Sequence, residues 1–215
     1  YYQMVHMEMG ELKISANDTV IANFLLHYLE QYHKLYPDIT IKVTNKTTEE
    51  SLRLLRSGAV DMCFVNLPIT DMEDLEVLSC IEINDVLVGG EKYRRLAEKG
   101  IELKELSKYP LMMLEEVSNS RRYITRYAEE NGVVLNPILE IGSSDLLINF
   151  AKINLGLTYA IRELTRELEE KKLYEIPVNP PVPKRSIGMV RLKNVAMSHA
   201  LQGFIDLMDL PKKES

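Results

Sequence analysis

The end of a predicted helix is joined to a predicted buried strand in the stretch Leu55-Arg56-Ser57-Gly58-Ala59-Val60-Asp61-Met62-Cys63-Phe64-Val65. Leu52 and Leu55 stand at helical spacing, and Gly58 is the residue type that commonly ends a helix in a left-handed turn. The nearly continuous apolar run from Met62 suits a strand that is buried on both faces of a parallel sheet. This helix–turn–strand unit predicts an α/β fold.

The same alternation of helical and strand patterns extends in both directions from this stretch. Strands are predicted at residues 12–15, 39–44, 61–65, 86–88, 111–114, 138–141, 157–161 and 187–192, and helices begin after small polar residues between them. Repeated strand–helix units favour parallel sheets with helices on both faces. The predicted fold class is therefore α/β, with mostly parallel sheets flanked by helices.

Composition limits the classes of protein to which the chain can belong. It has 215 residues, 46% of them apolar, which allows one large domain or two small lobes with a core. The net charge is −6, whereas proteins that neutralise nucleic-acid phosphates are usually basic, so this chain itself is not expected to bind nucleic acid. The local basic group Arg121, Arg122 and Arg126 is interpreted as a solvated helix face.

The sequence shows neither a targeting signal nor a cysteine pattern of disulfide bonds or zinc sites. No apolar run approaches the roughly 18 residues that a membrane span requires, and the first residues have no signal-peptide pattern. Cys63 and Cys80 are the only cysteines, and they make neither a disulfide framework nor a zinc pattern. A cytoplasmic protein without membrane contact is the expectation.

Motifs of catalysis are missing. There is no P-loop, no GxGxxG turn, no HExxH pair and no GxSxG elbow, and the four histidines are scattered along the chain. No residue is therefore predicted to be catalytic, to bind a metal or to hold a cofactor. An enzyme stays open as an alternative that nothing in the sequence requires.

Small polar residues recur where a predicted strand is followed by a helix. The four clusters are Asn17-Asp18-Thr19, Thr47-Thr48, Ser118-Asn119-Ser120 and Ser143-Ser144. Helix N-termini bind anions, and ligands of open α/β sheets lie beyond the carboxyl ends of the strands. A single cap is usually structural. Four such clusters without a catalytic motif favour a cleft that binds a small polar or anionic molecule.

Four segments, in this order, resemble the effector-binding domain of LysR-type transcriptional regulators. They are residues 12–19, residues 55–65, residues 118–121, and residues 140–145 leading to 154–160. The resemblance extends from about Gly10 to about Met208. Asn154 stands where the family often has glycine, but asparagine also tolerates left-handed backbone angles.

This resemblance implies two lobes of the type 2 periplasmic-binding-protein fold. Residues 1–83 and 164–215 would form lobe one, and residues 84–163 would form lobe two. The resemblance also implies a winged helix-turn-helix DNA-binding domain that precedes this chain and is absent from it, with residues 1–9 as the end of a linker helix. The expected partners are DNA, through that domain, and further copies of the chain in a homodimer or homotetramer.

The resemblance places a small-molecule effector in the cleft between the lobes. The family's effector contacts match Asn17, Asp18, Thr19, Thr47, Thr48, Asn66, Leu67, Pro68, Ser118, Asn119, Ser120, Thr158 and Tyr159. The expected function is that of a ligand sensor, in which an effector with a carboxylate or similar group favours one lobe arrangement by differential affinity. Two alternatives stay open: a solute-binding protein of a transport system, and an enzyme on the same fold.

Overall fold

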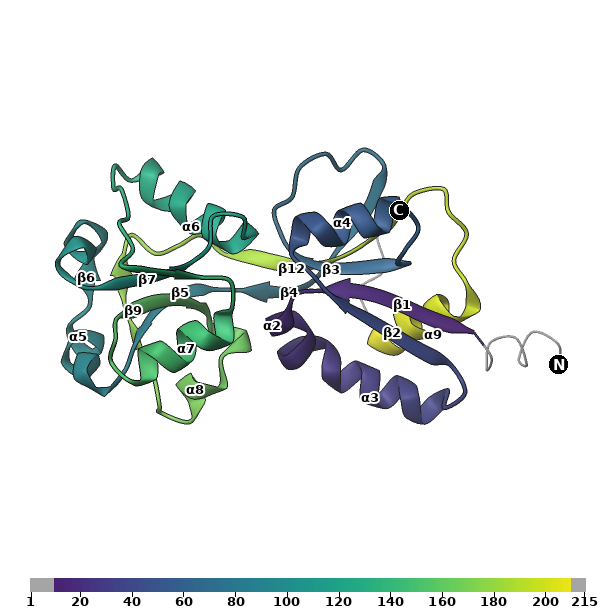
Figure 1. The fold of residues 1–215 in the computed structure, drawn as a ribbon, viewed down its shortest axis with the longest axis horizontal. Helices are drawn as coiled ribbons and strands as arrows, with labels where there is room; N and C mark the ends of the chain where they lie inside the picture. Colours follow the sequence, from purple (N-terminus) through teal and green to yellow (C-terminus); the bar gives the residue numbers. More distant parts are fainter. Residues whose placement is uncertain (1–9, 210–215) are drawn as a thin grey trace. The chain divides into compact units, whose positions relative to one another are not determined.

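The fold is built on two five-stranded sheets, each with helices packed on it (Figure 1). The computed structural model describes residues 10–209, so the expected linker end at residues 1–9 lies outside the described residues. The chain divides into two compact units. Within the described part, unit 1 holds residues 10–82 and 186–209, and unit 2 holds Ile83–Arg185.

Unit 1 is built on a sheet with the strand order β2-β1-β3-β12-β4. The strands are β1 (Glu11–Ala16), β2 (Thr40–Asn45), β3 (Met62–Asn66), β4 (Leu75–Ile83) and β12 (Arg185–Leu192). β1 runs parallel to β2 and to β3, whereas β12 is antiparallel to β3. The carboxyl ends of β1, β2 and β3 therefore share one edge of the sheet.

Helices cover both faces of the unit 1 sheet. α4 (Thr48–Arg56) lies on one face, and α3 (Leu26–Leu35) and α9 (His199–Met208) lie on the other (Figure 1). The short helix α2 (Asp18–Val20) and the π-helical turn η1 (Ile21–Leu25) lead from β1 into α3. The rings of Tyr32 and Phe64 pack edge-on against the ring of Phe204. The Tyr32 centroid lies 5.5 Å from the Phe204 centroid and the Phe64 centroid lies 6.3 Å from it, and all three side chains are fully buried. This aromatic cluster fastens α3 and α9 to β3.

Unit 2 has a sheet with the strand order β10-β5-β9-β7-β8. Its strands are β5 (Asp85–Gly89), β7 (Leu111–Leu114), β8 (Leu139–Ile141), β9 (Leu157–Ile161) and β10 (Tyr174–Ile176), and β6 (Ile101–Glu102) pairs separately with β11 (Val178–Asn179). β7 runs parallel to β8 and β9, whereas β5 is antiparallel to β9 and β10. The start of β5 therefore lies at the same edge as the carboxyl ends of β7 and β9.

The central strand β7 is buried on both faces. Its successive residues Met112 and Met113 belong to two different hydrophobic clusters, one with Leu147 of α7 and the other with Ile124 of α6. The helical segments of unit 2 are η2 (Glu91–Tyr93), α5 (Arg94–Lys99), η3 (Leu103–Lys108), α6 (Asn119–Glu130), α7 (Ser144–Lys152), η4 (Arg162–Leu164) and α8 (Arg166–Glu169). α6 and α7 thus enclose the sheet from opposite sides, as alternating side chains of a strand require.

The predicted α/β class is confirmed, and each predicted strand is present within a few residues of its expected bounds. Gly58 has a φ of +79°, as expected for a glycine that ends a helix. Both sheets are mixed. In unit 1, β12 runs antiparallel to β3, and in unit 2, β5 runs antiparallel to both β9 and β10. Among the described residues, no helix has the length and apolar composition needed to cross a bilayer.

The chain returns to unit 1 later than the sequence suggested. Residues 164–185, assigned to lobe one from the resemblance, pack in unit 2. The reason is that β10 pairs with β5, which sets Tyr174 opposite Gly89 and Ile176 opposite Leu87. A three-residue edge strand carries too little periodic pattern to be recognised from the sequence.

Candidate functional site

The predicted site residues of unit 1 gather at one edge of its sheet. Ala16 at the end of β1 lies opposite Asn45 of β2 and opposite Phe64 of β3. The loops that follow these strands carry residues 17–19, 47–48 and 66–68, so the structure brings all eight predicted residues of unit 1 to this edge. The prediction that they share the carboxyl edge follows from the parallel order of the three strands.

Several of these residues have a local structural role in unit 1. The Asn17 side chain accepts a hydrogen bond from the backbone N–H of Val20 at 3.0 Å and caps α2. Thr47 Oγ1 accepts from the backbone N–H of Glu50 at 3.3 Å and donates to the Glu50 carboxylate at 2.9 Å, which is part of a capping box on α4. The Leu67–Pro68 peptide bond is cis.

A pocket opens at the carboxyl edge of the unit 2 sheet, where β7 and β9 end and α6 and α7 begin. It holds about 400 Å³ of empty space, including space open to solvent. The lining residues are Asp85, Met112, Met113, Leu114, Ser120, Arg121, Ile124, Ser144, Thr158, Tyr159, Ala160 and Ile161. The pocket therefore combines an apolar wall with two charged residues and three hydroxyl-bearing residues besides Tyr159.

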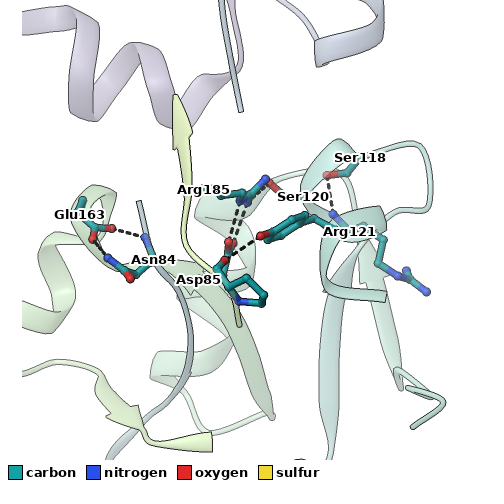
Figure 2. Close-up of polar contacts among 9 residues, drawn as sticks. Asn84, Asp85, Ser118, Ser120, Arg121, Glu163 and Arg185 are labelled. Atoms are coloured by element: carbon teal, nitrogen blue, oxygen red, sulfur yellow. Dashed lines mark hydrogen bonds and ion pairs between the residues drawn. The ribbon is translucent and has the colours of Figure 1, made fainter. Parts of the chain in front are cut away.

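Three of the five predicted residues of unit 2 line this pocket, namely Ser120, Thr158 and Tyr159. Ser118 instead caps α6, because its Oγ accepts a hydrogen bond from the backbone N–H of Arg121 at 3.3 Å (Figure 2). Asn119 is the first residue of α6 and is not among the lining residues. Burial raises the pKa of the Tyr159 phenol well above its ordinary value, so this side chain is neutral at physiological pH.

A buried ion pair lies at the pocket, and one of its members, Asp85, is a lining residue. Arg185 donates from Nε and Nη2 to the two carboxylate oxygens of Asp85 at 2.7 and 2.8 Å, and the side chains are only 2% and 3% exposed (Figure 2). Arg185 Nη2 also donates to Ser120 Oγ at 2.9 Å, and the guanidinium lies 4.7 Å from the centroid of the Tyr123 ring. Arg185 Nη1 is buried and has no hydrogen-bond partner among the described residues. The pair therefore joins Ser120, a lining residue, to the strand that leaves unit 2.

Arg121 turns inward, which corrects the interpretation of its basic group as a solvated helix face. Its Nη1 donates to the backbone carbonyl of Leu114 at 2.7 Å and to the Glu140 carboxylate at 2.8 Å, and its side chain is 9% exposed. Arg122 and Arg126 are exposed, as the sequence suggested. Arg121 thereby ties the ends of β7 and β8 together beside the pocket.

The sequence did not identify Asp85, Arg121, Ser144 or Arg185 as parts of the site. Ser144 had a detectable signal, because it belongs to one of the four polar clusters that start helices. Asp85 and Arg185 are 100 residues apart in the chain, so no local spacing connects them. Among the described residues, no group of three or more His, Cys, Asp or Glu side chains could hold a metal ion.

Comparison with known proteins identifies related sequences along nearly the whole chain. Residues 6–209 match the family described as the LysR substrate binding domain. The uncharacterised HTH-type transcriptional regulator YfeR of Shigella flexneri is 23% identical over 199 residues, which cover 93% of this chain and 64% of that regulator. The HTH-type transcriptional regulator CzcR of Bacillus cereus is 23% identical over 202 residues, which cover 93% of this chain and 66% of CzcR. The chain thus spans slightly less than two thirds of the length of these relatives.

Solved structures share the fold. The regulatory domain of CcmR from Synechocystis PCC6803, in complex with 2-PG, has a TM-score of 0.84 at 21% identity, covering 95% of this chain and 99% of that domain. The effector binding domain of QuiR, in complex with shikimate, has a TM-score of 0.80 at 19% identity, covering 93% and 95% of the two chains. At these identities the likeness establishes the two-lobed fold.

Proposed function

Because the chain belongs to the LysR substrate binding domain family, we propose that it senses a small-molecule effector that binds in the pocket of unit 2. The observation that carries this proposal is the composition of the pocket. Ser120, Ser144 and Thr158 offer hydroxyls beside the N-termini of two helices, and the remaining wall is mostly apolar. Small-molecule sites commonly combine a largely apolar surface with a few placed polar groups.

The effector class that fits best is a compact molecule with acceptor oxygens and an apolar body. The formal charges of Asp85 and Arg121 are each matched by an opposite charge within the unit, so the pocket has no unbalanced charge that calls for a highly charged ligand. Helix N-termini and hydroxyls favour a carboxylate or a similar group. Shikimate, the ligand of the QuiR domain, is a hydroxylated carboxylic acid.

The role of the whole protein is proposed by analogy with its relatives, which are HTH-type transcriptional regulators. Effector binding would alter how a DNA-binding domain elsewhere in the protein contacts DNA in the cytoplasm, and the chain would act as a homodimer or homotetramer. The effector's position between the lobes, with the eight residues of unit 1 as further contacts, stays a prediction. A transport protein is not favoured, since the curated relatives named above regulate transcription, and these relatives give an enzyme no support either.

Titration calorimetry of the chain with a panel of hydroxylated and keto carboxylic acids, including shikimate and 2-PG, tests this proposal. A ligand found in this way should bind Ser120→Ala about tenfold more weakly, which corresponds to one lost hydrogen bond to a charged group. Thr19→Ala tests the predicted contribution of unit 1 in the same assay.

Ser198→Ala is the matched control, because Ser198 caps α9 of unit 1 and contributes to neither predicted set. It should keep the wild-type affinity. A ligand whose affinity is the same for wild type, Ser120→Ala and a Ser144→Ala variant would show that the pocket of unit 2 is not its site.

A further inference from the structure

The sheet of unit 2 splits between β7 and β9. Residues 111–112 of β7 pair with residues 157–158 of β9, and the pairing stops there. Beyond that point β7 continues beside β8, and β9 continues beside β5. The split is therefore bounded by residues 113–114 on one side and residues 159–161 on the other, and all of these residues line the pocket. We call this opening the strand fork.

The backbone groups of Leu114 point into the strand fork. Successive backbone groups of a strand point to alternate sides, toward one neighbouring strand and then toward the other. The Glu115 N–H donates to the Ile141 carbonyl at the end of β8 at 3.1 Å, so Glu115 faces β8. Leu114, one residue earlier, consequently faces the opposite side, where β9 has left the ladder.

The backbone groups of Ile161 point into the strand fork from the other side. The Arg162 N–H donates to the Asn84 carbonyl beside β5 at 2.9 Å, so Ile161, one residue earlier, faces β7. Within the described residues, the registers of β5, β7, β8 and β9 leave the N–H groups of Leu114 and Ile161 without a ladder partner. Both residues are only partly exposed, so these two donors lie at the pocket wall.

Side chains satisfy the carbonyl groups at the same two positions. Arg121 Nη1 donates to the Leu114 carbonyl at 2.7 Å, and Thr165 Oγ1 donates to the Ile161 carbonyl at 2.7 Å. In a continued parallel ladder, the Leu114 carbonyl would accept from the Ile161 N–H. Arg121 takes the place of that donor, which leaves the Ile161 N–H without its natural acceptor.

The strand fork thus has more hydrogen-bond donors than acceptors. Its third carbonyl, that of Tyr159, has a longer contact of 3.4 Å with Thr158 Oγ1. All three carbonyls have a donor within the unit, whereas the two N–H groups need an acceptor from elsewhere. The Asp85 carboxylate at the same pocket is neutralised by Arg185, so an incoming anion does not meet an uncompensated negative charge.

We propose that the N–H groups of Leu114 and Ile161 form an oxyanion subsite of the pocket, which receives a carboxylate or phosphate group of the effector. Hydrogen bonds from N–H groups to an ionised acceptor are stronger than those to a neutral one, so the subsite favours an anion over a hydroxyl or an amide. Recognition by the main chain adds to the side-chain hydroxyls of the pocket. This inference rests on the proposed function, because it names the group that the same pocket recognises.

The first experiment uses the wild-type chain and simple anions. Amide resonances of the ¹⁵N-labelled chain are followed by NMR during titrations with sodium acetate and with sodium phosphate, and sodium chloride at equal ionic strength is the reference. The Leu114 and Ile161 amides should shift and saturate with acetate, with phosphate or with both, which distinguishes a carboxylate subsite from a phosphate subsite. The amides of Glu115 and Arg162, which have backbone acceptors, are internal controls and should shift less.

Two outcomes of this titration would overturn the proposal. In one, the Leu114 and Ile161 amides keep their positions with both oxyanions. In the other, chloride shifts them as much as acetate and phosphate do, so that the effect is one of ionic strength.

The second experiment removes one donor by Ile161→Pro. The φ of Ile161 is −86°, close to the angle that proline fixes, and its N–H has no ladder partner among the described residues, so proline should fit. Ile161→Ala is the matched reference, because it also shortens the side chain and keeps the N–H. Ile161→Pro should bind the oxyanion that shifts the wild-type amides about tenfold more weakly than Ile161→Ala does.

Equal affinities of the proline and alanine variants would contradict the subsite. If Ile161→Pro does not fold, Leu114→Pro and Leu114→Ala give the same comparison from the other side of the strand fork. Failure of this inference is distinct from failure of the proposed function. A metabolite that binds the chain without shifting either amide contradicts the subsite and leaves the sensor in place, whereas acetate or phosphate bound at the strand fork without any metabolite ligand supports the subsite alone.

Discussion

The carboxyl edges of the two sheets carry the same kinds of residue but use them differently. In unit 1, Asn17 and Thr47 are hydrogen-bonded to backbone N–H groups three residues ahead in their own helices. In unit 2, Ser120 is hydrogen-bonded to Arg185, 65 residues away, and lines a pocket. Both patterns look alike in a sequence, because both are small polar residues that follow a strand.

This difference teaches that residue type at a helix start does not separate a structural cap from a ligand contact. The separating feature is the origin of the hydrogen-bond partner. A cap is satisfied by its own helix within the next turn. Ser120, which lines the pocket, instead accepts a hydrogen bond from a side chain in a distant part of the chain. Four predictions would break or sharpen this comparison.

The largest effect is expected from Arg185→Met, which removes the long-range hydrogen bond from residue 185 to Ser120. The variant leaves the Asp85 carboxylate buried without its cation, which should lower the free energy of unfolding by about 3–5 kcal/mol. Urea unfolding followed by circular dichroism measures the loss. The double variant Asp85→Leu/Arg185→Met should recover most of it, and a loss below about 1 kcal/mol in the single variant would mean that the pair is not sealed from water.

Unit 1 has its own long-range polar contact, which lies between α3 and α9. The buried Tyr32 hydroxyl donates to the Ala200 carbonyl at 2.8 Å, and burial raises the pKa of Tyr32 to about 12. The folded state therefore keeps this proton more tightly than the unfolded state, where the pKa is near 10. Stability from this group is complete below pH 10 and should fall by about 2 kcal/mol as the pH rises to 12.

Chemical unfolding at several alkaline pH values tests this expectation. Tyr32→Phe should remove the part of the pH dependence that Tyr32 contributes, whereas Tyr28→Phe, a change in a partly exposed tyrosine of the same helix, should retain it. Equal pH dependence in wild type and Tyr32→Phe would contradict the assignment.

An effect of similar size is expected at Asn154, whose side chain accepts a hydrogen bond from another segment of unit 2. Asn154 has a φ of +64°, and its side-chain oxygen accepts from the backbone N–H of Lys92 at 3.0 Å. Asn154→Ala loses this bond and keeps a strained backbone, so unfolding should become easier by about 2 kcal/mol. Asn154→Gly relieves the strain and should lose only about half as much. Equal losses in the two variants would show that backbone strain is unimportant there.

The smallest effects are expected from the loss of one helix cap in each unit. Thr47→Ala in unit 1 and Ser118→Ala in unit 2 each remove one cap and should each lower stability by about 1 kcal/mol. Thermal unfolding measures both. A loss of effector affinity as large as that of Ser120→Ala in either variant would mean that the cap also touches the ligand.

Most of the fold could be predicted because its signals are local. The buried strand at residues 62–66 and the positive φ of Gly58 follow from an apolar run and a helix-ending glycine. β4 was missed although it is nine residues long, since its burial alternates irregularly along the strand. β10 was missed because its only support is the pairing with β5.

The site could be predicted only to the level of its loops. Ser120 was found through its place in a polar cluster that follows a strand, and Thr158 was found through the family resemblance; both line the pocket. Their neighbours Asp85 and Arg185 were not found, because an acidic residue at a strand start and an arginine after a proline-rich stretch are individually ordinary. The contact that gives them a role forms only when residues 100 positions apart meet in the fold.

The ion pair also has a consequence for the modularity of the chain. Unit 2 is one continuous segment, Ile83–Arg185, and the side chains of Asp85, near its beginning, and Arg185, at its end, form an ion pair with Nε and Oδ2 2.7 Å apart. A segment with adjoining ends can be excised, circularly permuted or transplanted into another host with little disturbance of the flanking backbone. Unit 2, which carries the pocket, is thus organised as a cassette whose two ends are joined by the Arg185–Asp85 ion pair.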